Sequence, residues 1–411
     1  QKEWWTRFGD PLLNGLIELA LIDNQRVARA VAQLQFAQAR LKESEAGDSL
    51  LASLGLQTSA TERSRASNQS EGTRTSLSLD LALPIDTNGK ISAQVEAAAM
   101  AVRQSQANLR GTILAVSTEV ATEYLRFRGN QKQLDLLLES IEVQEKTLGI
   151  VQIRFETGLS PELDVRRAET SVQNLKASLP PLEQTLTENR NRLATLTSNT
   201  PLEMKVILQA PADLPSYTSP LPLAVPAQAI AQRPDVQVAL AQAMSSIAQT
   251  DVARADYYPS LRITGSIEAG TLSSLSPSTF AVGTLSALLE QLLIDGDARE
   301  ARLEQAQATA LADLATYELT VQSAIEEIEN QLASIMNSRD RLQALEKAAQ
   351  SSRRSFAQAD ALYQLGLVSF LDVVDAQRVL ANAEQNLAAE KTRQATLVAG
   401  LFQILGMQQT N

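Results

Sequence analysis

The chain has no cysteine and no histidine among its 411 residues. These two absences exclude cysteine nucleophiles, histidine-based catalytic triads and the usual zinc, copper and iron sites. Aromatic residues make up only 4% of the sequence, which is low for a compact enzyme of this size. We therefore expect no enzyme, no metal site and no bound cofactor.

Charge and hydrophobic runs exclude two further classes. The net charge of −11 argues against a nucleic-acid partner, because binding to phosphates needs a basic surface. No run of 18 apolar residues occurs, so the sequence predicts no membrane-spanning helix. Alanine, glutamine, leucine, glutamate and serine dominate instead, a composition typical of long helices that pack through small side chains.

Two segments predict helices of unusual length. Lys90 to Thr157 is 68 residues without proline, and Asp297 to Leu365 is 69 residues without glycine or proline. At 1.5 Å per residue each helix would be roughly 100 Å long. A lone helix of that length cannot bury its apolar side, so we expect a sheath of similar helices. The segment after the first long helix has a coiled-coil seam, interrupted at Pro180 and Pro181.

The chain is a tandem repeat. The segment Gly158–Val165 matches Gly366–Val373 at an offset of 208 residues, and Ile85–Asp86 matches Ile294–Asp295 at an offset of 209. We therefore predict a first repeat over 1–200, a second over 227–411, and an extended linker over 201–226, which carries six prolines.

Each repeat follows the same plan. A helix precedes two strands, a very long helix, a tight turn and a helix that runs back. The first helices are expected at about 11–47 and 223–256, and the strands near 54–65, 73–85, 260–270 and 279–294.

The expected strands are amphipathic. Leu77, Leu79 and Leu81 alternate with Ser78 and Asp80, so one face is apolar and the other polar. Two interpretations stay open: a soluble sheet with one wet face, or a sheet whose apolar face meets lipid and whose polar face lines a lumen. Four strands cannot close a barrel, and eight give a barrel filled by side chains. In the membrane interpretation, three or more chains would have to share one conducting barrel.

Five motifs in order along the chain resemble those of a known family. They are Trp4-Trp5-x-x-Phe8-Gly9-Asp10-Pro11, Gln232-Arg233-Pro234-Asp235-Val236, Tyr257-Tyr258-Pro259-Ser260-Leu261, Ile294-Asp295-Gly296 and Tyr363-x-x-Gly366-x-x-Ser369-x-x-Asp372-Val373-x-Asp375-Ala376. Together they resemble the TolC-type outer membrane factors of Gram-negative efflux and secretion systems. The lipoprotein branch typified by OprM and VceC is the most similar.

This resemblance implies a mainly α-helical chain with two β-hairpins. It implies a homotrimer with a shared 12-stranded barrel in outer membrane lipid and a periplasmic tunnel of twelve helical strands. The implied function is a passive exit duct of a tripartite efflux or secretion system, with a periplasmic adaptor (membrane fusion) protein and an inner-membrane transporter as partners. The branch usually begins with a lipidated cysteine, which this chain lacks, so we expect a precursor with a signal peptide and an acylated cysteine upstream of Gln1.

The turn at Gly366 carries the candidate gate. Gly366 suits the left-handed residue that ends a helix, and Ser369-x-x-Asp372 is close to a capping box. Asp372 and Asp375 share a helix face. The resemblance implies that these aspartates form an acidic constriction at the closed tunnel end. Asp164 is the first-repeat counterpart of Asp372 and joins the candidates.

Other residues near the two turns complete the candidates. Tyr363 and the arginines 166, 167, 353 and 354 could lock the gate by holding aspartates of another hairpin, or could simply lie on a solvated face. The hairpin tips are the expected contact with the adaptor. They comprise Gly158, Leu159, Ser160, Gly366, Leu367, Val368 and Ser369.

Two interpretations from another class compete with a conduit: a soluble coiled-coil spacer and a subunit of a pore-forming toxin. A spacer has no use for amphipathic strands placed at matching positions in both repeats. A toxin would need no acidic ring at the far end of its helices.

Overall fold

The computed structural model describes residues 4–61, 72–218, 220, 227–273 and 277–406. Within these residues, no helix has an apolar stretch long enough to cross a membrane.

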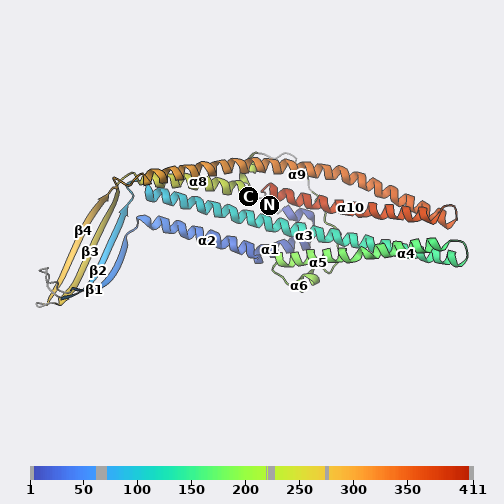
Figure 1. Ribbon diagram of the computed structural model, residues 1–411, viewed down its shortest axis with the longest axis horizontal. Helices are drawn as coiled ribbons and strands as arrows, with labels where there is room; N and C mark the ends of the chain where they lie inside the picture. Colours follow the sequence, from blue (N-terminus) through green and yellow to red (C-terminus); the bar gives the residue numbers. More distant parts are fainter. Residues whose placement is uncertain (1–3, 62–71, 219, 221–226, 274–276, 407–411) are drawn as a thin grey trace. The chain divides into compact units, whose positions relative to one another are not determined.

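The first repeat follows the predicted plan with one additional break. It contains η1 (Trp4–Phe8), α1 (Pro11–Asp23), α2 (Gln25–Glu45), η2 (Ala46–Asp48), β1 (Leu51–Thr61), β2 (Gly72–Ile85), α3 (Lys90–Glu156), α4 (Glu162–Ala177) and α5 (Leu179–Leu196), and α6 (Pro201–Ile207) follows it (Figure 1). The long helix and the break before the two prolines are confirmed. The expected helix 11–47 is divided at Asn24, whose buried side-chain amide donates to the Leu196 carbonyl at 2.7 Å.

The second repeat contains the corresponding elements. They are α7 (Ala227–Gln232), α8 (Pro234–Ala255), β3 (Ser260–Ser273), β4 (Ser278–Glu290), α9 (Ala298–Gln364) and α10 (Phe370–Ile404). The predicted helix is again divided, this time at Arg233, while its residues 223–226 lie outside the described residues. The first strand of the first repeat was expected to reach residue 65, and 62–65 lie outside them too.

The prediction of an extended linker is wrong for residues 201–207, which form α6. Thr200 and Glu203 make a capping box, with the Thr200 backbone N–H donating to the Glu203 carboxylate at 2.7 Å, and Pro201 takes the first helical position. Proline fits that position because its missing N–H would have no helical partner there. Residues 208–218 form neither helix nor strand, and 221–226 are outside the described residues.

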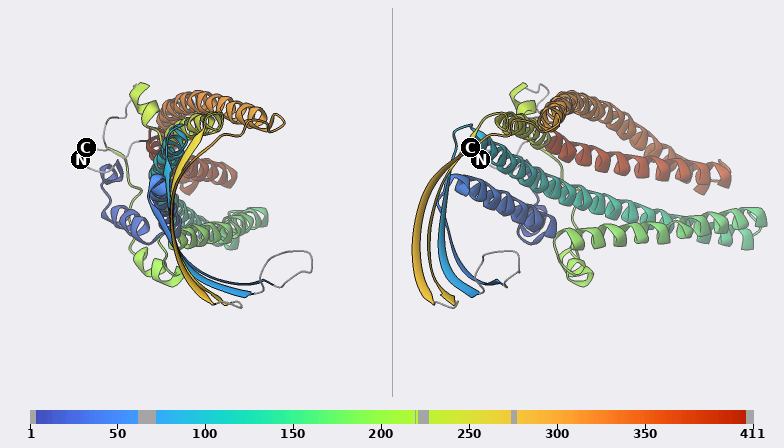
Figure 2. Two further views of the ribbon diagram at one scale, coloured as in Figure 1. Left: turned by 90° about the vertical axis from the view of Figure 1, so that its left-hand side faces the viewer. Right: turned by 60° about the vertical axis from the view of Figure 1, so that its left-hand side comes forward.

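The four strands form one antiparallel sheet in the order β1-β2-β3-β4. Strand β2 pairs with β3, so the two repeats meet in the sheet, with Leu79 opposite Ile267. The pairing places Leu56, Leu77 and Leu285 on the same face as Leu79 and Ile267. The other face carries many residues with hydroxyl groups. The strands make a single curved layer (Figure 2).

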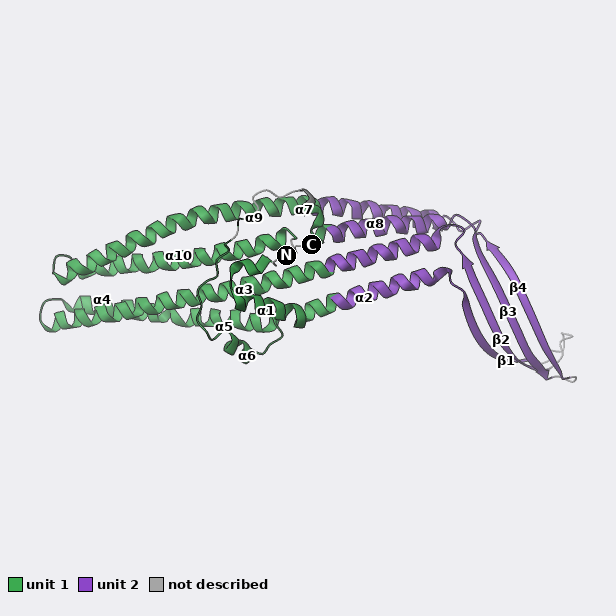
Figure 3. Ribbon diagram, turned by 180° about the vertical axis from the view of Figure 1, so that it is seen from behind, with its two compact units in different colours: residues 1–30, 109–236, 321–411 green, residues 31–108, 237–320 purple. Residues whose placement is uncertain are grey.

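Two compact units emerge from the contacts within the chain, and both contain segments of both repeats (Figure 3). Unit 1 comprises residues 1–30, 109–236 and 321–411, and unit 2 comprises 31–108 and 237–320. Unit 1 therefore holds both helix turns, and unit 2 holds the sheet. The repeat boundaries at 200 and 227 stay a prediction.

An aromatic cluster lies in the core of unit 1. Trp4 stacks on Phe402 with ring centroids 5.1 Å apart, and Tyr217 lies 5.4 Å from both Phe8 and Phe402. Trp5 is buried beside them. The N-terminal segment, with both tryptophans buried, is thereby packed against the C-terminal helix.

Candidate functional site

The two helical hairpins of unit 1 end in the same kind of turn. Gly158 and Gly366 adopt φ values of +71° and +75°, the left-handed conformation that glycine reaches without strain. The N–H of Leu159 donates to the Arg154 carbonyl at 2.7 Å, and that of Leu367 donates to the Leu362 carbonyl at 2.9 Å. The sequence repeat thus produces two matching turns, one joining α3 to α4 and the other joining α9 to α10.

Both hairpins contribute to one small hydrophobic core near these turns. The buried members come from all four helices: Val151 of α3, Val165 and Ala168 of α4, Tyr363 of α9, and Phe370 and Val373 of α10. The two hairpins therefore contact each other through apolar side chains next to their turns. Any motion that separates them must expose this core.

Tyr363 is the center of the contact between the hairpins. Its side chain is 5% exposed and packs 5.8 Å from the Phe370 ring, so the prediction of a solvated face is wrong for this residue. The Arg154 guanidinium of the other hairpin lies over the Tyr363 ring, 4.7 Å from its centroid. Arg154 Nη1 also donates to the Tyr363 backbone carbonyl at 3.2 Å. One arginine thus holds both the ring and the backbone of the facing helix.

The electrostatics around the tyrosine also bring Asp164 into the site. Burial raises the pKa of the Tyr363 phenol, the nearby charge of Arg154 lowers it, and the charge of Asp164 raises it. Within the described residues, the phenol oxygen has no hydrogen-bond partner. Asp164 accepts from the Ser160 hydroxyl at 3.2 Å and lies 3.7 Å from Arg167 of its own helix. Tyr363 and Arg154 are therefore in direct contact across the two hairpins, and the Asp164 carboxylate acts on the phenol only through its charge.

Asp372 has the predicted capping role. Its carboxylate accepts from the Ser369 hydroxyl at 2.6 Å and from the Ser369 backbone N–H at 2.9 Å. These hydrogen bonds, the hydroxyl first, hold the pKa of Asp372 below its usual value. Asp375 lies on the exposed side of α10 and pairs with Arg378 at 2.6 Å. Whether the two aspartates line a constriction stays a prediction, because that depends on other copies of the chain.

Three of the four arginines selected from the sequence, Arg166, Arg167 and Arg353, form local pairs instead of a lock. Arg166 pairs with Glu162 and Glu169 of its own helix, and Arg353 pairs with Glu384 across its own hairpin. The solvated-face interpretation is thus confirmed for both. Sequence reasoning missed Arg154, and only its position in the last turn of α3 could have indicated its role.

The tips themselves are apolar and exposed. Leu159 and Leu367 are 70% and 68% exposed, and Leu163 and Leu371 one turn further are also exposed. Within the described ranges, no group of three or more carboxylates is placed to hold a metal ion. The tips therefore offer a hydrophobic surface next to a charged one.

Comparison with known proteins gives a consistent result. A family model described as outer membrane efflux protein matches residues 16–199 and 225–407. Nodulation protein T of Rhizobium leguminosarum bv. trifolii is 27% identical over 414 residues, covering 98% of this chain and 87% of that protein. The toluene efflux pump outer membrane protein TtgC of Pseudomonas putida is 26% identical over 420 residues, covering 99% and 85%.

The fold is also that of a solved channel. The structure of the outer-membrane channel OprN superposes with a TM-score of 0.92 at 27% identity, covering 99% of this chain and 92% of that one. The mostly helical chain with a small sheet is thus a shared architecture. The matched family and this structure are channels rather than enzymes.

Proposed function

Because the chain belongs to the outer membrane efflux protein family, we propose that three copies of it form a passive exit duct of a tripartite efflux or secretion system. The duct lies in the outer membrane with a large periplasmic portion. It receives substrates from an inner-membrane transporter through a periplasmic adaptor.

The open-edged sheet is the observation that supports this proposal most strongly. Strands β1 and β4 each pair on one side only within the described chain. The apolar face is open to solvent in the single chain, with Leu56 and Leu285 76% and 83% exposed. Unpaired backbone groups are costly in hydrocarbon, so such a sheet enters lipid only after its edges are closed.

The number of copies follows from the strand count and the size of a barrel. Two copies give eight strands, which form a barrel whose interior is filled by side chains. Three copies give twelve strands and room for a lumen lined by the polar face. The alternation of apolar and polar residues then matches lipid outside and water inside.

We place the periplasmic gate at the hairpin ends of unit 1. In a trimer, Asp372 and Asp375 would supply six carboxylates around a narrow axis, and rings of acidic side chains select cations. The contact of Arg154 with Tyr363 would hold each chain's hairpins closed. The adaptor would bind the exposed tips and shift the population toward the open state.

The mass of the assembly tests the shared barrel. The protein purified in detergent should have a mass of about three times 44.5 kDa after correction for bound detergent. A stable monomer or dimer in a folded, detergent-solubilised sample would contradict the closure argument.

Ion selectivity in planar bilayers tests the gate. The double variant Asp372→Asn and Asp375→Asn should lose cation selectivity and block by trivalent cations, because asparagine keeps the shape of aspartate without its charge. Asp340→Asn on α9, which removes an exposed charge away from the turns, is the matched control. Wild-type selectivity in the double variant would show that the two aspartates are only capping and surface residues.

A further inference from the structure

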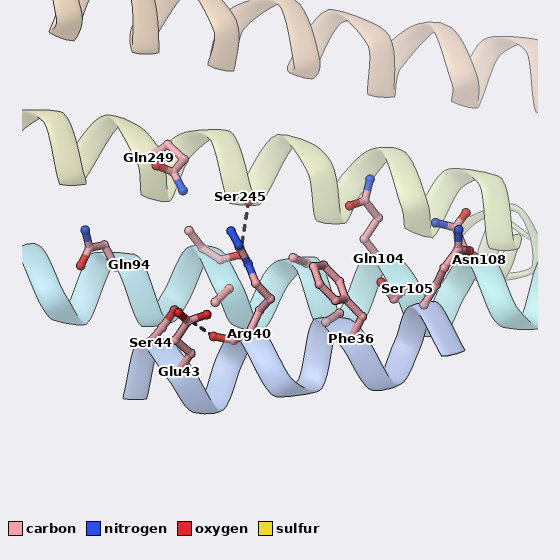
Figure 4. A pocket seen from close by; sticks show the side chains of 15 residues that line it. Phe36, Arg40, Glu43, Ser44, Gln94, Gln104, Ser105, Asn108, Ser245 and Gln249 are labelled. Carbon is pink, nitrogen blue, oxygen red and sulfur yellow. Dashed lines mark hydrogen bonds between the residues drawn. The ribbon is translucent and has the colours of Figure 1, made fainter. Parts of the chain in front are cut away.

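A groove of about 740 Å³ lies within unit 2, between α2, α3 and α8 (Figure 4). Its floor is made of small side chains, among them Ala37, Ala97 and Ala101, which leave room above them. Its rim carries side-chain amides, including Gln33 and Gln104. A volume of this size is typical of sites for small molecules.

Phe36 is the single aromatic residue of the lining. Its side chain is 66% exposed, in a chain where only 4% of residues are aromatic. Ala37 of the same helix is buried, whereas the Phe36 ring extends into the groove. An exposed ring next to amide groups offers a flat apolar surface with hydrogen-bonding groups around it.

Arg40 supplies a positive charge one turn from this ring. Its guanidinium carbon is 5.9 Å from the Phe36 centroid. Within the described residues, Arg40 forms no ion pair, although Glu43 lines the same groove. The guanidinium is therefore a donor group available to a ligand anion.

We propose that this groove is a weak binding site for aromatic anions, that is, flat rings bearing a carboxylate or sulfonate. The ring of the ligand would stack on Phe36, its anionic group would bind Arg40, and the amides would accept or donate hydrogen bonds at its other substituents. This inference goes beyond the proposed duct function, because it assigns a class of ligand to a groove in unit 2 and not to the gate at the hairpin ends of unit 1.

The open form of the groove predicts weak and reversible binding. An exposed ion pair and one stacking surface give only weak binding, since solvent screens the charge. Glu43 weakens the binding of an anion in this groove, because its carboxylate repels a negative charge bound nearby.

Direct binding of 2-naphthalenesulfonate to the full chain in detergent, measured by calorimetry and corrected for empty micelles, tests the proposal. Arg40→Gln and Phe36→Ala should each weaken binding about five-fold, the loss of one exposed charged hydrogen bond or one stacking contact. Glu43→Gln should strengthen it. With 2-naphthylmethylammonium the Arg40 and Glu43 effects should reverse. Lys42→Gln, an exposed cation of α2 outside the groove, should change neither affinity.

An accessibility measurement completes the test. Because the chain has no cysteine, Gln33→Cys would introduce a single thiol at the rim of the groove. Its reaction with a charged maleimide should proceed in the assembled protein and slow when 2-naphthalenesulfonate is present. A thiol that does not react would show that a second copy covers the groove, and unchanged affinities in Arg40→Gln and Phe36→Ala would show that no such site exists. Either result overturns this inference, while a conducting trimer would still support the duct.

Discussion

The contact between Arg154 and Tyr363 allows a graded test of how the hairpins are held together. Three substitutions remove different parts of it. Arg154→Met removes the guanidinium but keeps an unbranched side chain. Tyr363→Leu removes the aromatic ring but keeps the backbone carbonyl, and Tyr363→Phe removes only the hydroxyl.

The structure indicates the size of each of the three effects. A cation over an aromatic face contributes about 1 kcal/mol, and a hydrogen bond from a charged donor contributes roughly 1.5 kcal/mol. Arg154→Met loses both, so about 2.5 kcal/mol per chain, or roughly a 70-fold rise in the ratio of open to closed hairpins. Tyr363→Leu loses the contribution of the ring to the arginine contact and also the packing of the ring against Phe370, so the rise should exceed about five-fold. Tyr363→Phe should change little, because the phenol oxygen has no partner within the described residues.

Conductance of the purified protein in planar bilayers, without adaptor, measures this ratio as open probability. The mass in detergent and the helical circular dichroism signal of each variant serve as controls for assembly and folding. The expected open probability of wild type and Tyr363→Phe is low, and that of Tyr363→Leu and of Arg154→Met is clearly higher.

Two results would refute this reasoning. An Arg154→Met protein that stays as closed as wild type would show that the arginine does not hold the hairpins. A Tyr363→Phe protein that opens as much as Arg154→Met would show that the hydroxyl, not the ring, makes the essential contact.

Three further changes test the packing of unit 1. Gly129→Ala should lower the melting temperature and reduce the free energy of unfolding by about 1–3 kcal/mol, because the new methyl group would overlap the Thr392 side chain. Gly149→Ala on the same helix is the control: its methyl group meets open space, so it should be neutral or slightly stabilising. Burial, and after it a hydrogen bond to an aspartate, raises the pKa of Tyr124 to about 12. The protonated phenol therefore contributes its full stabilisation of the fold below about pH 10, and this contribution is lost as the pH rises toward 12. Melting temperatures of Tyr124→Phe should therefore fall less over that range than those of wild type, and an equal fall would contradict the assignment. Asn24→Ala leaves a buried carbonyl without its donor and should lower the free energy of unfolding, measured by chemical denaturation, by about 1–3 kcal/mol. An unchanged midpoint would show that this hydrogen bond does not stabilise the helix break.

The regular elements of this protein were predictable because their causes are local. The long helices follow from continuous stretches without proline, and the strands follow from alternation between apolar and polar residues. The same holds for the turns, since a left-handed residue at Gly158 or Gly366 depends only on the missing side chain. Asp372 was identified as a cap from its spacing to Ser369, a contact over three residues.

The candidate site was only partly predictable for the opposite reason. Tyr363 was selected as a gate residue, but its burial and its partner depend on a helix about 200 positions earlier in the chain. Nothing in the sequence marks Arg154 among 36 lysines and arginines as the one that faces this ring. The pairing of β2 with β3 and the groove at Phe36 likewise join segments far apart in the sequence.

The sequence by itself therefore determined the lengths of the helices, the faces of the strands and the duplicated turns. Each of these depends on interactions between residues a few positions apart. Only the tertiary structure decided which side chains of the two repeats meet and where α2 begins. Those outcomes depend on packing between distant segments, where a choice among many similar alanine, leucine and arginine side chains is made by shape and burial rather than by local pattern.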